Sequence, residues 1–139
     1  MKNKDLPFSI GEHYENWEHN LEILDVEEVI RGYDSYVYLG EIKFLGIVPQ
    51  QTELVFLWDY LQAVIFTFKF EPLEQVNQFR SNLIQSFGVS KFKENFEVHS
   101  ISDEVELWTN YYLLSSSATV LYERNGVLRN LIASRFNDF

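Results

Sequence analysis

The chain has 139 residues, of which 46% are hydrophobic and 17% aromatic, so we expect one domain with a buried core over residues 1–139. It contains no cysteine, which excludes disulfides, thiolate metal sites and cysteine nucleophiles. Its formal net charge of −10 argues against nucleic acid and against an anionic membrane surface as partners, because both attract clusters of Lys and Arg.

The first predicted element is a helix near residues 11–20. In "IGEHYENWEHNLEIL", the apolar residues Tyr14, Trp17, Leu21 and Leu24 are spaced by three or four positions, as on one face of a helix. Several glutamates near its start suit the positive end of a helix dipole. The next stretch, "LEILDVEEVIRG", either extends this helix or forms a strand, and its weak alternation leaves both open.

Two strands are predicted next, at residues 36–39 and 42–47. Both lie in "DSYVYLGEIKFLGIVPQQ", which is rich in aromatic and β-branched residues, and Gly40 separates them. Residues 49–51 then form a connector that leads into the most apolar stretch of the chain.

That stretch is "LVFLWDYLQAVIFTFKF", residues 54–70. A membrane helix needs about 20 almost uncharged residues, whereas this run is shorter and carries Asp59 in its middle. Its β-branched and aromatic residues favour strands. We therefore predict two antiparallel strands, 52–57 and 61–70, that turn at Asp59.

The clearest helix is predicted over residues 72–87. Apolar residues recur at helical spacing from Leu73 to Phe87, with polar residues between them. Pro72 suits the first turn of a helix, and Gly88 is a natural C-terminal stop.

The rest of the chain reads as mostly extended. We expect "VSKFKENFEVHSISDE" to be a loop with some extended character, and "EVELWTNYYLL" to be an aromatic-rich strand. Two further strands are predicted near 118–124 and 127–135. Asn125 and Gly126 join them, and this dipeptide is a strong signal for a tight hairpin turn.

Together these elements predict an α+β fold, with an antiparallel twisted sheet of about six strands, two packed helices and the order α-βββ-α-βββ. The loose similarity of "FSIGEHYENW" and "QSFGVSKFKENF" raises the hypothesis of a degenerate repeat, 8–70 and 71–139. The centre of residues 54–70 is apolar on both faces, so both must be covered. We expect the 72–87 helix on one face, and the 11–20 helix, a second sheet layer or a second subunit on the other.

The sequence has no catalytic signature. Glu15, His19 and Glu22 would share one face of a helix, but a solvated acidic surface explains them better than a metal site. No serine lies in a Gly-x-Ser-x-Gly elbow, and the glycines are too dispersed for a phosphate-binding loop. We therefore expect no catalytic residue, no metal and no cofactor.

The leading binding hypothesis concerns the strand "EVELWTNYYLL" and the acidic residues at its start. On a strand, Trp108 and Tyr112 point one way and Tyr111 points the other. Aromatic anchors with an acidic rim suit a basic, hydrophobic protein partner. A strand covered on both faces is the competing interpretation. The candidate binding residues are Trp108, Tyr111, Tyr112, Asp103, Glu104 and Glu106.

We therefore expect a small acidic, non-catalytic interaction domain, and one version of this hypothesis is an immunity-like protein that neutralises a basic partner. We expect it in the cytoplasm, because the N-terminus "MKNKDLPFSIGEHYENW" lacks the apolar stretch of a secretory signal. The alternative is a pocket for a small apolar ligand, lined by Phe66, Phe68, Phe70 and Trp108 and closed by the 72–87 helix. A homodimer through the edge of "EVELWTNYYLL" is a further hypothesis.

Overall fold

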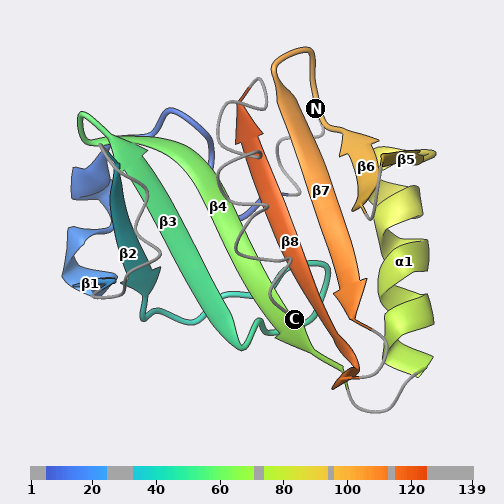
Figure 1. Cartoon of the computed structure of the whole chain (residues 1–139). Helices are drawn as coiled ribbons and strands as arrows, with labels where there is room; N and C mark the ends of the chain where they lie inside the picture. The colour runs from blue at the N-terminus through green and yellow to red at the C-terminus, as the bar shows by residue number, and fades with distance from the viewer. Residues whose placement is uncertain (1–5, 25–32, 71–73, 94–95, 113–114, 125–139) are drawn as a thin grey trace.

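The computed structural model describes residues 6–24, 33–70, 74–93, 96–112 and 115–124. Within them lie eight strands and one α-helix (Figure 1). In chain order these are β1 (Leu21–Ile23), β2 (Asp34–Tyr38), β3 (Gln51–Leu57), β4 (Tyr60–Lys69), α1 (Glu74–Phe87), β5 (Lys91–Lys93), β6 (Phe96–Ser100), β7 (Val105–Tyr112) and β8 (Ser117–Arg124).

The strands form one antiparallel sheet in the order β1-β2-β3-β4-β8-β7-β6-β5, with α1 near the β5 end (Figure 1). The α+β class and the antiparallel sheet are confirmed. The expected order α-βββ-α-βββ, with about six strands and two helices, is wrong. Among the described residues, no helix combines the length and the apolarity needed to cross a bilayer.

Each half of the described chain contributes four consecutive strands, and the halves meet where β4 pairs with β8. Such an arrangement is compatible with a repeat of 8–70 and 71–139. The two similar segments nevertheless lie in different places, because residues 8–17 precede β1 whereas residues 85–96 span the end of α1 and all of β5. The repeat stays a prediction.

The hairpin of β3 and β4 was predicted closely, with strands at 52–57 and 61–70. Its turn consists of Trp58 and Asp59, whose φ angles are +54° and +69°. Two successive residues with positive φ are typical of a type I′ turn, whose twist matches that of the flanking strands. The pairing shifts between Val55 and Phe56, where a bulge tightens the local twist.

The predicted helix at 11–20 is wrong. The segment instead forms two short 3₁₀ turns, Tyr14–Asn16 and Glu18–Asn20, followed directly by β1. A 3₁₀ helix has three residues per turn, so it also brings Tyr14 and Trp17 to one side, which is why the spacing was misleading. Both side chains pack against the core.

The predicted strand at 42–47 is also wrong, whereas the one at 36–39 corresponds to β2. Phe44 and Ile47 exchange both backbone hydrogen bonds, at 2.9 and 3.1 Å, across a turn of Leu45 and Gly46. Both turn residues have positive φ, which glycine adopts without strain. The turn buries Phe44 against Phe66, with ring centroids 5.1 Å apart.

The helix predicted at 72–87 is confirmed as α1, although residues 71–73 lie outside the described part. Val76, Phe79, Leu83 and Phe87 of its apolar stripe are buried, whereas Ile84 is half exposed. The segment expected to be a loop at 89–104 contains β5 and β6. The strand "EVELWTNYYLL" is β7 as far as Tyr112, and 118–124 is β8. The Asn125–Gly126 turn and the strand at 127–135 lie outside the described residues.

The sheet buries apolar side chains on both faces, as the pattern of residues 54–70 predicted. On one face, α1, the N-terminal segment and the Phe44 turn cover a large aromatic cluster. The 11–20 segment was an option for covering the opposite face, but it lies on the same face as α1. The opposite face holds a second buried cluster, made of Val55, Ala63, Ile65, Phe96, Val98, Trp108 and Leu121.

The N-terminal segment is held on the sheet by a buried tyrosine. The Tyr122 hydroxyl donates to the carbonyl of Phe8 at 2.8 Å and accepts from its backbone N–H at 3.2 Å. Tyr122 is fully buried, and burial raises the pKa of its phenol. One side chain therefore satisfies two backbone groups that are out of reach of water.

Replacing Tyr122 by Phe should lower the free energy of unfolding by about 2 kcal/mol, because both backbone groups of Phe8 lose their partner while buried. Urea unfolding of wild type and variant measures this as a lower midpoint at unchanged slope. The same change at Tyr60, which is half exposed, is the control and should shift stability by less than about 0.5 kcal/mol. Equal effects at both positions would contradict the role of the Tyr122 hydroxyl.

Candidate functional site

The six predicted binding residues do not form one surface. Trp108 is only 7% exposed and lies in the second cluster, with its ring 5.4 Å from that of Phe96. Tyr112 packs on the same face, whereas Tyr111 packs against the core on the opposite face. The alternation that was predicted for these aromatic residues is present, but Trp108 is not an exposed anchor.

The three acidic candidates lie in different surroundings. Asp103 and Glu104 are exposed in the connection between β6 and β7, and Glu104 forms an ion pair with Arg124 at 3.8 Å. Glu106 is half-buried on β7, directly across from Glu123 on β8. An acidic rim around exposed aromatics is therefore not found here, and a binding role for these residues stays a prediction.

Tyr111 belongs to a polar cluster that the sequence analysis missed. Arg80 on α1 donates to the Glu97 carboxylate on β6 at 2.8 Å, and the Tyr111 hydroxyl donates to the same carboxylate at 3.5 Å. The Arg80 guanidinium also lies 5.3 Å from the centre of the Tyr111 ring. Burial and the charge of Glu97 raise the pKa of Tyr111. This cluster fastens α1 to the sheet.

His99 lies on β6, two residues after Glu97, and is fully buried. Among the described residues, neither ring nitrogen has a hydrogen-bond partner. Burial lowers the pKa of His99, and the nearby charge of Glu97 opposes this shift only in part. The imidazole is thus held in its neutral form inside the fold.

The proposed apolar pocket is not formed by the residues expected to line it. Phe66, Phe68 and Phe70 are fully buried side by side, and Phe79 of α1 packs on Phe68 with ring centroids 5.0 Å apart. Trp108 lies on the other face of the sheet. The four side chains therefore do not line a common cavity.

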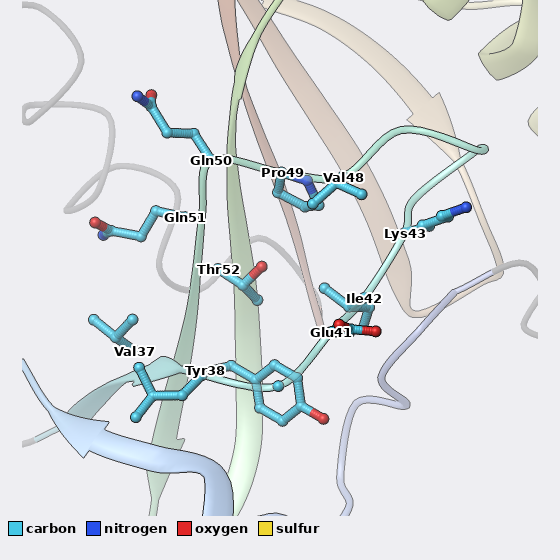
Figure 2. A pocket seen from close by; sticks show the side chains of 12 residues that line it. Val37, Tyr38, Glu41, Ile42, Lys43, Val48, Pro49, Gln50, Gln51 and Thr52 are labelled. Atoms are coloured by element: carbon cyan, nitrogen blue, oxygen red, sulfur yellow. The ribbon is translucent and has the colours of Figure 1, made fainter.

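A hollow of about 580 Å³ lies instead between β2, the start of β3 and the connector at 39–50. In Figure 2, Gln50 and Gln51 extend to one side of the hollow and Lys43 extends to the other, so these three polar side chains do not converge. Small-molecule sites combine apolar walls with a few convergent polar groups. The hollow lacks this second feature, so we assign it no ligand.

The residues Glu15, His19 and Glu22 are not aligned on one helix. Glu15 and His19 lie in separate 3₁₀ turns, and Glu22 lies on β1. In the described part of the chain, no group of three or more His, Asp or Glu side chains is arranged to hold a metal ion.

Two exposed aromatic residues lie at the β3–β4 turn. Trp58 is 83% exposed and Tyr60 is 51% exposed, and the Tyr60 ring contacts that of His13 at 5.2 Å. Asp59 lies between them, and Glu12 and Glu15 flank His13 in the sequence. We call this surface the turn patch, made of Glu12, His13, Glu15, Trp58, Asp59 and Tyr60.

Backbone hydrogen bonds join the two segments of the turn patch. Leu61 exchanges hydrogen bonds with the N-terminal segment, accepting from Gly11 N–H and donating to the carbonyl of Glu12, both at 2.8 Å. Tyr14 N–H donates to the carbonyl of Asp59 at 2.7 Å. The acidic residues near position 13 are thereby held next to the turn.

An aromatic base supports the turn patch from below. The rings of Tyr14, Tyr36 and Phe56 contact one another with centroids 5.4 to 5.8 Å apart. Burial raises the pKa of Tyr36, and the nearby Tyr14, Asp34 and Asp59 raise it further. The carboxylates of Asp34 and Asp59 therefore place negative charge beside Tyr36, next to the turn patch.

One signal in the sequence pointed to this surface. Placing the hairpin turn at Asp59 also puts the neighbouring Trp58 at the tip, where a turn residue is exposed. The position of residues 12–15 next to that tip had no such signal, because it depends on hydrogen bonds between segments more than forty residues apart.

No family model matches the chain, and no curated protein matches it. Among solved structures, one that matches is a cysteine-rich secretory protein from Staphylococcus aureus, with a TM-score of 0.44 and 13% sequence identity. The match covers 86% of this chain and 46% of that one, so this chain spans less than half of its length. A likeness of this degree supports no functional assignment, and function has to be inferred from the side chains themselves.

Replacing Arg80 by Ala should destabilise the fold by about 2 kcal/mol, because Glu97, only 3% exposed, would lose a charged hydrogen bond from a side chain that is itself 44% exposed. Arg80→Lys should lower the free energy of unfolding less than Arg80→Ala does, because the positive charge remains although the planar donor geometry is lost. Urea midpoints of the three proteins give the comparison. A wild-type midpoint for Arg80→Ala would show that the ion pair does not fasten α1.

Acid should weaken the fold through His99. Unfolding restores its pKa to about 6.5, so the unfolded state takes up a proton that the folded state resists. Stability from this source is constant above pH 6.5 and falls below it, by up to about 1.4 kcal/mol per pH unit. Between pH 5 and 7, the free energy of unfolding of His99→Leu should depend less steeply on pH than that of wild type. His19→Gln, at an exposed position, should keep the wild-type slope.

Proposed function

We propose that this protein is a non-catalytic interaction domain that binds a basic protein partner through the turn patch. The observation that carries the proposal is Trp58, a large aromatic side chain that is 83% exposed at a positive φ of 54°. A bulky residue at such an angle is a conformational outlier.

Trp58 has no evident role in the stability of the fold. Type I′ turns favour Asn-Gly, and a side chain with a Cβ in the left-handed region costs about 1–2 kcal/mol. Its exposure means that the indole also gains little from burial. Strained positions that break a local rule without a structural gain are typical of functional sites.

The neighbours of Trp58 define the chemistry of the partner. Trp and Tyr are enriched among the residues that dominate binding energy at interfaces. Glu15 and Asp59 are exposed, and within the described residues neither forms an ion pair with Lys or Arg. An Arg side chain of a partner can stack on the indole while its guanidinium meets a carboxylate. A partner surface rich in Arg and Lys therefore fits best.

Neutralisation of such a partner, as by an immunity protein, is the concrete form of this proposal. The net charge of −10 would speed association with a cationic surface, and binding should weaken as salt screens it. A protein that acts by covering its target needs no catalytic group. A cytoplasmic location is part of the same proposal.

The test uses a double variant, Trp58→Asn with Asp59→Gly, that removes the anchor and one carboxylate while giving the turn its preferred residues. We expect this variant to be more stable than wild type by about 1 kcal/mol, because the strain at position 58 is relieved. A lower urea midpoint would contradict this interpretation of the turn. Stability and binding should thus change in opposite directions.

Binding is measured by quantitative pull-down from the native lysate, followed by calorimetry of any recovered protein at 50 and 200 mM salt. Wild type should recover a basic protein that the double variant loses, with weaker binding at the higher salt. Leu39→Asn with Glu41→Gln also removes an exposed apolar side chain and a carboxylate, and it should bind like wild type. A recovered set that is the same for all three proteins would overturn the proposal.

A further inference from the structure

The sheet edge at β5 differs in charge from the rest of this acidic molecule. The described residues contain six Lys and Arg side chains, at positions 43, 69, 80, 91, 93 and 124. Three of them lie where α1 meets β5, because Arg80 reaches Glu97 and Glu97 pairs with Phe92 of β5. Lys91 and Lys93 flank Phe92 on that strand and are exposed.

The same corner exposes apolar side chains. Phe92 is 70% exposed, Val89 is 89% exposed and Ile84, one turn after Arg80 on α1, is 50% exposed. Contiguous exposed apolar groups with a polar rim are typical of interaction sites. We call this surface the basic corner, made of Arg80, Ile84, Val89, Lys91, Phe92 and Lys93.

The side chains of β5 alternate in a defined way. Lys93 lies over the Trp108 ring, with its Nζ 5.5 Å from the ring centre, so Lys91 and Lys93 are on the face that carries the second cluster. Phe92 points to the other face, toward α1. Within the described residues β5 pairs only with β6, so its outer edge carries backbone groups available to another strand.

We propose that the basic corner binds an extended acidic segment of a partner protein, which adds to the sheet beside β5. Main-chain hydrogen bonds to β5 would supply affinity, as in other cases of strand addition. Two carboxylates at alternate positions of the segment meet Lys91 and Lys93. The apolar residue between them packs on Phe92.

Lysines at a sheet edge also serve to prevent pairing, and this is the competing explanation. Protection alone does not account for Phe92, Val89 and Ile84, because exposed apolar groups at an edge promote association. A second copy of this chain fits less well than a partner. Suppose that β5 pairs with β1, the other edge strand, so that their middle residues face each other. Glu22 of one copy then lies opposite Phe92 of the other.

The probe is a fluorescein-labelled peptide of sequence TEVEVET, titrated with full-length protein and followed by fluorescence anisotropy. The peptides TEEEVVT, with the same composition, and TKVKVKT, with the opposite charge, are controls. We expect TEVEVET to bind at least tenfold more tightly than either. In nitrogen-15 NMR spectra, its addition should shift the backbone amides of residues 91–93.

The variant K91E/K93E should weaken TEVEVET binding at least tenfold, whereas K43E/K69E, with the same change in net charge, should bind like wild type. The inference does not rest on the turn patch, so Trp58→Asn with Asp59→Gly should also bind the peptide normally. Equal binding of TEVEVET and TEEEVVT, or equal losses in the two charge variants, would overturn the inference. The inference would also be overturned if wild type did not bind the peptide and K91E/K93E self-associated. The lysines would then serve only to prevent strand pairing at this edge.

Discussion

The turn patch depends on how the N-terminal segment is docked onto the sheet. Tyr122 holds both backbone groups of Phe8, and three residues further on Gly11 begins the pairing with Leu61. These contacts place an acidic segment beside a hairpin turn that already exposes Trp58. Without them, the turn would keep Trp58 and Asp59 but would lose the neighbouring carboxylates of Glu12 and Glu15.

The second organising constraint is a single sheet that is buried on both faces. α1, the Phe44 turn and the N-terminal segment all cover the same face, which gathers most of the described phenylalanine residues into one cluster. The opposite face mixes a smaller apolar cluster with polar residues such as Glu53, Thr119 and Glu123, all buried. Central strands can therefore offer neither face to a partner. The two surfaces that we propose for binding lie at the β3–β4 turn and at the edge strand β5, and they carry opposite charge.

The idea of aromatic anchors with an acidic rim could be reached from the sequence, but its position could not. The sequence pattern favours the strand with Trp108, because its aromatic and acidic residues are close together in sequence. In the structure β7 pairs with both β6 and β8, so Trp108 is enclosed. Whether a strand is central or at an edge depends on pairing between distant segments. Trp58 and Glu15 are far apart in sequence, and only such pairing brings them to one surface.

By itself the sequence determined the local elements that rest on short-range physics: the apolar stripe of α1, the hairpin of residues 51–69 with its turn at Asp59, and the acidic net charge. These depend on side-chain period, on turn geometry and on composition, which neighbouring residues define. Only the tertiary structure decided that residues 14–20 form 3₁₀ turns, that Phe44 closes a tight turn, and that eight strands share one sheet. Each of these depends on long-range contacts, since a hydrogen bond or a buried ring from a distant segment outweighs a local preference of a few tenths of a kcal/mol.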